Sequence, residues 1–112
     1  MSASQYERDY KHQLEAEGWT VFRSAGSLAV DLVALKRLPS GKIIVMLIEV
    51  KSFKPDVFTV RKTKRMLRQW RDMLKLAKKF TVFYSLRMKG QKTFRLVEPK
   101  NLLKPYHWSK NP

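Results

Sequence analysis

The chain has 112 residues and carries 24 Lys and Arg against 9 Asp and Glu, a formal net charge of +15 at pH 7. This length suits one domain, and we expect a single domain over residues 1–112. A hydrophobic fraction of 44%, with 12% aromatic residues, favours a packed core over a disordered chain. The absence of cysteine excludes a disulfide framework, a thiolate zinc site and a cysteine nucleophile.

The sequence gives no sign of a membrane or secretory protein. Its longest apolar run, residues 43–48, is far shorter than the ~20 residues of a membrane helix, and the N-terminus does not resemble a signal peptide. We therefore expect a soluble, cytoplasmic protein with no membrane partner and no organic cofactor. With only two histidines, any metal would need oxygen ligands, which favours Mg²⁺, with Mn²⁺ as a substitute.

Positive charge is concentrated in the second half of the chain. Residues 51–79 contain eleven bases and two acids, whereas residues 1–35 contain three bases and five acids. Such asymmetry makes one side of a small domain strongly positive and suits it to a polyanion such as a nucleic acid. The alternative is a solvated basic face without a specific partner.

The first half of the chain predicts a helix followed by three strands. Tyr6, Tyr10 and Leu14 recur at four-residue spacing in a helix that starts at a serine cap and ends at Gly18. The expected strands are listed in chain order: residues 19–24, 30–36 and 42–51. The third is apolar on both faces, so we expect it to lie in the centre of the sheet.

The second half predicts a basic amphipathic helix and two more strands. Residues 61–79 place apolar side chains at helical spacing, with a basic opposite face: Arg61, Lys64, Arg65, Arg68, Lys75 and Lys79. Strands follow at 80–86 and 93–97, and the basic tail from about residue 99 has no clear period. The expected fold is α/β, one mixed sheet of about five strands flanked by helices in the order α-β-β-β-α-β-β.

Two of the few acidic residues lie inside apolar strand segments. Asp31 and Glu49 would each be costly to bury without a partner or a metal ion. Strand alternation places Glu49 and Lys51 on one face, and an adjacent second strand would bring Asp31 beside them. Two carboxylates and an ammonium suit metal-dependent phosphodiester hydrolysis. The alternative is a structural ion pair of Lys51 with one of the acids.

Three further features have more than one interpretation. Glu7 either completes a capping box with Ser4 or, if Ser2 is the cap, reaches the metal site from the first helix turn. Gln69 borders the apolar stripe of the second helix and could face the same site. Phe53 and Phe58 either stack on exposed bases or pack in the core.

The sequence also resembles a known family. The segments that carry the resemblance are Tyr6-Glu7-Arg8, Gly18 to Ser27 with its Arg-Ser-Ala-Gly-Ser run, Val30-Asp31-Leu32-Val33-Ala34 and Ile48-Glu49-Val50-Lys51-Ser52. Together they are similar to the archaeal-type Holliday junction resolvases of the PD-(D/E)xK nuclease superfamily. The resemblance implies a restriction-endonuclease-like core, a homodimer and a four-way DNA junction as substrate.

The resemblance also implies roles for individual residues. Asp31 and Glu49 would bind Mg²⁺, Glu7 would complete the metal site, Lys51 would assist the attacking water, and Ser27 would have a catalytic or DNA-contact role. With the basic helix, it favours DNA contacts from these residues: Arg8, Arg23, Ser24, Lys54, Arg61, Lys64, Arg65 and Arg68.

Our hypothesis is a Mg²⁺-dependent, structure-selective endonuclease that resolves four-way junctions with paired nicks. Two alternatives stay open: a non-catalytic nucleic-acid-binding protein and a sequence-specific restriction-type nuclease. Candidates for the interface of the homodimer are apolar residues of the second half: Phe83, Phe94, Leu102 and Leu103.

Overall fold

The computed structural model describes residues 3–24 and 29–111. The elements follow in chain order: α1 (Ala3–Ala16), β1 (Thr20–Arg23), β2 (Leu32–Arg37), β3 (Ile43–Phe53), β4 (Val57–Phe58), α2 (Lys64–Leu76), β5 (Thr81–Met88), β6 (Arg95–Val97), the 3₁₀ turn η1 (Pro99–Leu102), β7 (Tyr106–His107) and η2 (Trp108–Lys110). Within the described residues, no helix has the length and apolar character needed to cross a membrane. The predicted order of the main elements is confirmed.

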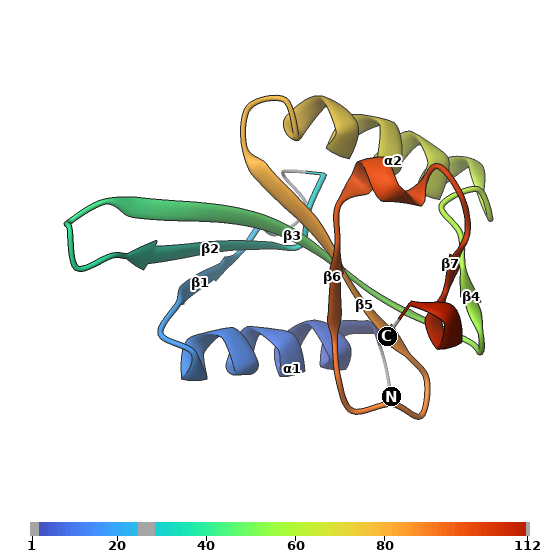
Figure 1. Cartoon of the computed structure of the whole chain (residues 1–112), viewed down its shortest axis with the longest axis horizontal. Helices are drawn as coiled ribbons and strands as arrows, with labels where there is room; N and C mark the ends of the chain where they lie inside the picture. The colour runs from blue at the N-terminus through green and yellow to red at the C-terminus, as the bar shows by residue number, and fades with distance from the viewer. Residues whose placement is uncertain (1–2, 25–28, 112) are drawn as a thin grey trace.

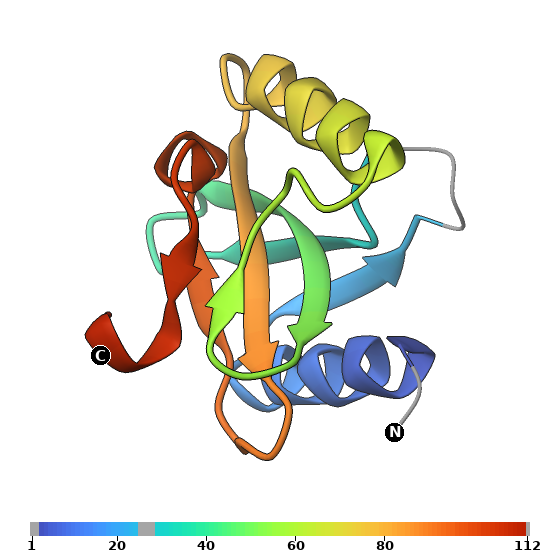
Figure 2. The ribbon, with the colours of Figure 1, turned by 90° about the vertical axis from the view of Figure 1, so that its right-hand side faces the viewer.

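The central sheet has the strand order β1-β2-β3-β5-β6 in the described part of the chain. β3 is parallel to β5, and the other neighbouring pairs are antiparallel, so the sheet is mixed as predicted. β3 lies in the middle, which its continuous apolar run had indicated. The helices α1 and α2 cover opposite faces of the sheet, and the β2–β3 hairpin extends beyond both (Figures 1 and 2).

Helix α1 packs on one face of the sheet through its four-residue stripe. Tyr6, Tyr10 and Leu14 are buried and form a core cluster with β2 and β3 residues such as Leu32 and Ile48. The helix already includes Ser4, so Ser4 is not its N-cap and the Ser4–Glu7 capping box is wrong. The alternative cap, Ser2, lies outside the described residues.

Helix α2 covers the other face and is shorter than the sequence predicted. It begins after Thr63, whose side chain accepts a hydrogen bond from the Met66 amide at 3.0 Å, and it ends at Leu76 instead of residue 79. Trp70 and Met73 are buried, as expected for the apolar stripe. The Trp70 indole donates to the Pro99 carbonyl at 2.7 Å, which ties the helix to η1.

The C-terminal tail is packed against the body of the protein, although its sequence has no regular period. β7 pairs with β4, and the centre of the Phe53 ring lies 5.6 Å from that of Phe58 and 5.9 Å from that of Trp108. Both Phe53 and Phe58 are buried in this cluster, so of their two interpretations the structure supports packing in the core and not stacking on DNA bases.

Candidate active site

The site forms where β3 runs past the start of β2. The register pairs Leu32 with Ile48, so the β2 ladder does not cover the following residues of β3. Asp31 lies one residue before β2, not inside a strand as predicted, and its amide donates to the Ile48 carbonyl at 3.0 Å. Its carboxylate Oδ2 accepts a hydrogen bond from the Val50 amide at 3.0 Å. This bond satisfies a backbone N–H of β3 that lies beyond the end of the β2 ladder.

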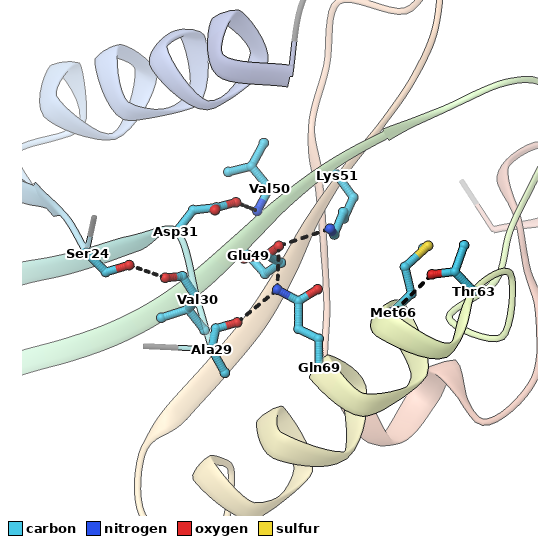
Figure 3. A network of polar contacts seen from close by, with 10 residues as sticks. All are labelled: Ser24, Ala29, Val30, Asp31, Glu49, Val50, Lys51, Thr63, Met66 and Gln69. Atoms are coloured by element: carbon cyan, nitrogen blue, oxygen red, sulfur yellow. Dashed lines mark hydrogen bonds and ion pairs between the residues drawn. The ribbon is translucent and has the colours of Figure 1, made fainter. Parts of the chain in front are cut away.

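Glu49 is the most deeply buried carboxylate of this site. Figure 3 shows its contacts with Lys51 and Gln69. Its side chain is only 4% exposed, and Oε2 accepts from the Gln69 amide at 2.8 Å and pairs with the Lys51 ammonium at 3.1 Å. The other oxygen, Oε1, has no hydrogen-bond partner among the described residues. Burial, and then the nearby negative charge of Asp31, raises the pKa of Glu49 to about 7, although Lys51 and Gln69 act in the opposite direction.

Gln69 belongs to this site, which selects one of its sequence interpretations. Its side-chain amide donates to the Ala29 carbonyl at 3.1 Å as well as to Glu49, so α2 is connected to the segment before β2 and to β3. Residues of α1, of the sheet and of α2 together line one cleft of about 530 Å³. Its lining residues are Tyr6, Glu7, Val30, Asp31, Glu49, Val50, Lys51, Ser52, Arg65, Met66 and Gln69.

Glu7 faces this cleft from α1 but is already paired. Its Oε1 lies 2.7 Å from Nε of Arg23, and Arg23 is largely exposed. Among the described residues, no three His, Cys, Asp or Glu side chains lie close enough together to form a metal-binding group. Glu7 thus lines the same cleft as Asp31 and Glu49 but is not grouped with them as a metal ligand. Its role as a further metal ligand stays a prediction.

The donor set fits a hard divalent cation. Two carboxylates converge, and one of them is almost fully buried and has an oxygen without a hydrogen-bond partner among residues 3–24 and 29–111. A buried carboxylate oxygen without a partner is costly, and a bound cation would offset both this cost and the repulsion between Asp31 and Glu49. Oxygen ligands are those that Mg²⁺ and Mn²⁺ prefer.

Replacing Glu49 with Gln should stabilise the metal-free protein at high pH. Because the pKa of Glu49 is about 7 in the folded protein against an ordinary 4.5, folding favours the neutral form, and stability is lost as the pH rises from about 4.5 to about 7. We expect Glu49→Gln to raise the free energy of unfolding by about 3 kcal/mol at pH 8 in chelator, and by less than about 1 kcal/mol at pH 5. Urea unfolding at both pH values measures this.

The matched control is Glu98→Gln. Glu98 is half-exposed in an ion pair with Lys100, and such a pair contributes at most about 1 kcal/mol. The control should therefore show no gain at pH 8. A wild-type protein as stable at pH 8 as at pH 5, with no gain in Glu49→Gln, would contradict the description of Glu49 as a strained buried charge.

The predicted DNA-binding residues near α2 lie in different surroundings. The exposed bases of this helix, named here the α2 basic face, are Lys64, Arg65, Arg68, Arg71 and Lys75. Of these, Arg65 also lines the cleft. Arg61 precedes the helix, and its guanidinium lies 5.8 Å from the centre of the Trp70 ring. Lys54 is exposed in the turn after β3.

The remaining predicted residues lie around α1 and β1. Arg8 and Arg23 line a second, smaller groove beside Glu7, together with Lys11 and His12. Ser24 donates its hydroxyl to the Val30 carbonyl, so it stabilises the start of β2. Ser27 lies outside the described residues, and its role stays a prediction.

Two hydroxyl-bearing side chains of the cleft, Tyr6 and Ser52, were not foreseen. The four-residue stripe predicts a core position for Tyr6, which is buried, yet this side chain also lines the cleft. Ser52 lines it too, although strand alternation places it on the opposite face from Glu49 and Lys51. Ser52 lies on β3 beyond the end of the β2 ladder, and Tyr6 reaches the same place from α1. The strand register and the position of α1 on the sheet would have been needed to predict this.

A mixed α/β fold that places two carboxylates and a lysine in a cleft beside a basic helix suits a nuclease. A sequence model of the archaeal Holliday junction resolvases (Hjc) matches residues 2–107. The chain therefore belongs to the archaeal Holliday junction resolvase family, and it is a structure-selective nuclease that resolves DNA junctions.

Comparison of the fold agrees with this assignment. The chain is similar to the Hjc resolvase of the archaeal hyperthermophile Archaeoglobus fulgidus, with a TM-score of 0.64 and 21% sequence identity over 88% of this chain and 73% of that one. A comparison with curated proteins finds no match. At this identity the solved structure establishes the shared fold, which includes the predicted sheet flanked by helices.

Proposed function

We propose that the cleft hydrolyses phosphodiester bonds with a divalent cation held by Asp31 and Glu49, and that Glu7 completes the metal site. Mg²⁺ is the expected ion, and Mn²⁺ is expected to replace it. The observation that carries this proposal is the buried Glu49 Oε1, which has no partner among the described residues although Asp31 and Lys51 lie beside it. When bound, the cation supplies an activated water and neutralises charge on the phosphate.

The side chains around the two carboxylates have separate tasks. Gln69 donates a hydrogen bond to one oxygen of Glu49, and the Val50 amide donates to one oxygen of Asp31. Both carboxylates are therefore oriented before any ligand arrives. The Lys51 ammonium is a quarter exposed and reaches the cleft while it pairs with Glu49. From there it donates to the attacking water or to a phosphate oxygen, where it stabilises the charge that develops during hydrolysis.

The substrate is a four-way DNA junction, bound through the surfaces that border the cleft. The α2 basic face lies on one side of it, and Arg8 and Arg23 lie on the other. Arg61 and Lys54 extend the α2 side, and Ser24 and Ser27 are proposed to meet a phosphate near β1. Lys and Arg contacts with phosphates supply most of the affinity without reading the base sequence. The protein is expected to act in the cytoplasm, where the DNA is.

Calorimetric titration with Mg²⁺ and Mn²⁺ tests the metal site without any cleavage assay. We expect the wild-type protein to bind Mg²⁺, or Mn²⁺ in its place, at one site. Glu49→Gln and Asp31→Asn should lose that binding, because each removes the negative charge of a carboxylate ligand. Glu98→Gln should bind as the wild type does. Equal binding by the wild type and both site variants would overturn the assignment of these ligands.

We also propose that the active species is a homodimer, because resolution needs paired cuts and one cleft can cut one strand at a time. A two-fold dimer places two equivalent clefts on a junction of similar symmetry. Exposed apolar side chains support this: Phe80 is 50%, Leu96 43% and Leu103 60% exposed. Leu102 is only 1% exposed, so the prediction that it contributes to the interface is wrong.

The proposed interface lies on the side formed by β6 and the end of α2. Leu96 lines one hollow and Phe80 another, and the two hollows share Phe83, Glu98 and Lys100. Charged substitutions at Phe80 and Leu96 together should convert the dimer to a monomer and lower paired nicking at least ten-fold at a given concentration. Analytical ultracentrifugation measures the first effect.

The control for this experiment is Ile43→Asp. Ile43 is equally exposed, at 54%, but lies on the projecting β2–β3 hairpin (Figure 1). This variant should remain dimeric. A wild-type protein that sediments as a monomer while it cuts junctions in pairs would contradict the proposal.

A further inference from the structure

Arg87 occupies an unusual position for a residue of such a basic protein. It lies on β5, and its guanidinium carbon is 5.1 Å from the centre of the Tyr6 ring and 5.2 Å from the centre of the Phe94 ring. The side chain is only 14% exposed. Most other bases of this chain face solvent, whereas this one is enclosed by aromatic rings.

Hydrogen bonds fix the guanidinium in this position. Nη1 lies 3.4 Å from the Asp9 carboxylate, and Nε donates to the Gln91 carbonyl at 2.6 Å. Tyr10 adds a second contact between the same elements, because its ring lies 4.8 Å from that of Phe94. Arg87 therefore joins the first turns of α1 to β5 and to the loop before β6.

This contact lies directly beside the proposed catalytic cleft. Tyr6 lines the cleft, and the next residue of α1 is Glu7, which also lines it. The β3 residue that pairs with Arg87 in the sheet is Ser52, a third lining residue. A shift or rotation of α1 at Tyr6 would therefore move Glu7 relative to Asp31 and Glu49, which belong to the sheet.

We propose that Arg87 is a positioning residue that fixes α1 on the sheet, so that Glu7 is held at the catalytic cleft. This inference rests on the proposed role of Glu7 in the metal site. The planar guanidinium suits the task because it can contact two rings on its faces and still direct N–H groups at Asp9 and Gln91. With these contacts made, Arg87 acts through Glu7 and not through a DNA phosphate.

A double-mutant cycle between Arg87 and Glu7 tests this route. We expect Arg87→Met to lower the single-turnover rate of junction cleavage about 30-fold, because misplacement of a catalytic group by about 1 Å can have such an effect. Junction affinity should change less than about three-fold. In a Glu7→Gln background, Arg87→Met should lower the rate less than two-fold further, because the group that it positions is already gone.

A conservative variant and a surface control separate positioning from folding. Arg87→Lys keeps a charge near Asp9 but cannot fill the slot between the rings, so we expect a rate between those of the wild type and Arg87→Met. Lys92→Gln, in the same loop and exposed, should behave as the wild type. Arg87→Lys also keeps the test decisive if Arg87→Met fails to fold, because it is carried through the same cycle.

Three outcomes would overturn the inference. If Arg87 and Glu7 substitutions lower the rate independently, Arg87 does not act through Glu7, and the proposed metal site stands. If the Arg87 variants lose affinity and rate in parallel, Arg87 is a DNA contact. If Glu7→Gln cuts at the wild-type rate, both the role of Glu7 in the proposed function and this inference are overturned.

Discussion

Glu49→Gln and Asp31→Asn should each abolish junction cleavage while they leave junction binding intact. Each substitution keeps the shape of the side chain but removes a carboxylate charge from the pair that faces the cleft. Without that charge the proposed cation is not held, and the rate should fall on the order of 100-fold or more. Binding should change less than about three-fold, because it arises from the separate basic surfaces.

Single-turnover cleavage of a synthetic junction at saturating protein measures the rate, and a mobility-shift titration in chelator measures the affinity. Glu15→Gln is the matched control, since this exposed carboxylate pairs with Lys11 and lies outside both the cleft and the proposed dimer interface. Retention of more than one-tenth of the wild-type rate in both site variants would contradict the assignment of Asp31 and Glu49 as metal ligands.

Charge reversal on the α2 basic face should have the second largest effect, this time on affinity. Arg65 and Arg68 are exposed on the first turns of α2, and Arg65 borders the cleft. Arg65→Glu with Arg68→Glu should weaken binding to a junction at least ten-fold at about 0.1 M salt. Because phosphate contacts carry no sequence information, the loss should be the same for junctions of different sequence.

The salt dependence of binding gives an independent measure of the same surface. Each lost phosphate contact should reduce the slope of log affinity against log salt by about 1, so the double variant should have a clearly shallower slope. Arg37→Glu with Lys42→Glu changes the net charge equally, but on the β2–β3 hairpin, away from the cleft and from the proposed dimer interface. If both double variants lose affinity equally, the effect is one of net charge, and the α2 basic face is not the DNA contact.

The sequence predicted the parts of the fold that depend on simple periodicity. The four-residue stripe of Tyr6, Tyr10 and Leu14 and the stripe around Trp70 and Met73 are the two faces that pack on the sheet. The continuous apolar run of β3 correctly predicted its central place. These patterns are reliable because burial of an amphipathic face dominates the energy of such elements.

Features that depend on pairing between distant segments were not predictable in this way. β7 pairs with the two-residue strand β4, and the Arg95 guanidinium lies 3.7 Å from the centre of the Trp108 ring, which fixes the tail. Neither contact has a local period. The strand register of β2 and β3 decides where Asp31 lies relative to Glu49, so sequence predicted the proximity of these acids but not the Val50 hydrogen bond.

Part of the site could not be predicted from the sequence, because the contacts of Gln69 and Lys51 each had two interpretations. Gln69 could have faced solvent, and only the angle of α2 on the sheet brings its amide to Glu49. The identity of the Lys51 partner was undecided between two acids, and the structure pairs Lys51 with Glu49. These outcomes depend on a few ångströms of helix and strand placement, which side-chain spacing alone does not determine.

The most direct test of a junction-resolving metal nuclease is a comparison of two substrates under identical conditions. A synthetic four-way junction and a linear duplex of the same sequence are incubated with the protein in Mg²⁺ and, separately, in chelator. We expect paired nicks near the branch point of the junction in Mg²⁺ only, and little cutting of the duplex. Equal cutting of both substrates would instead support a restriction-type nuclease, and binding without cutting would support a non-catalytic nucleic-acid-binding protein.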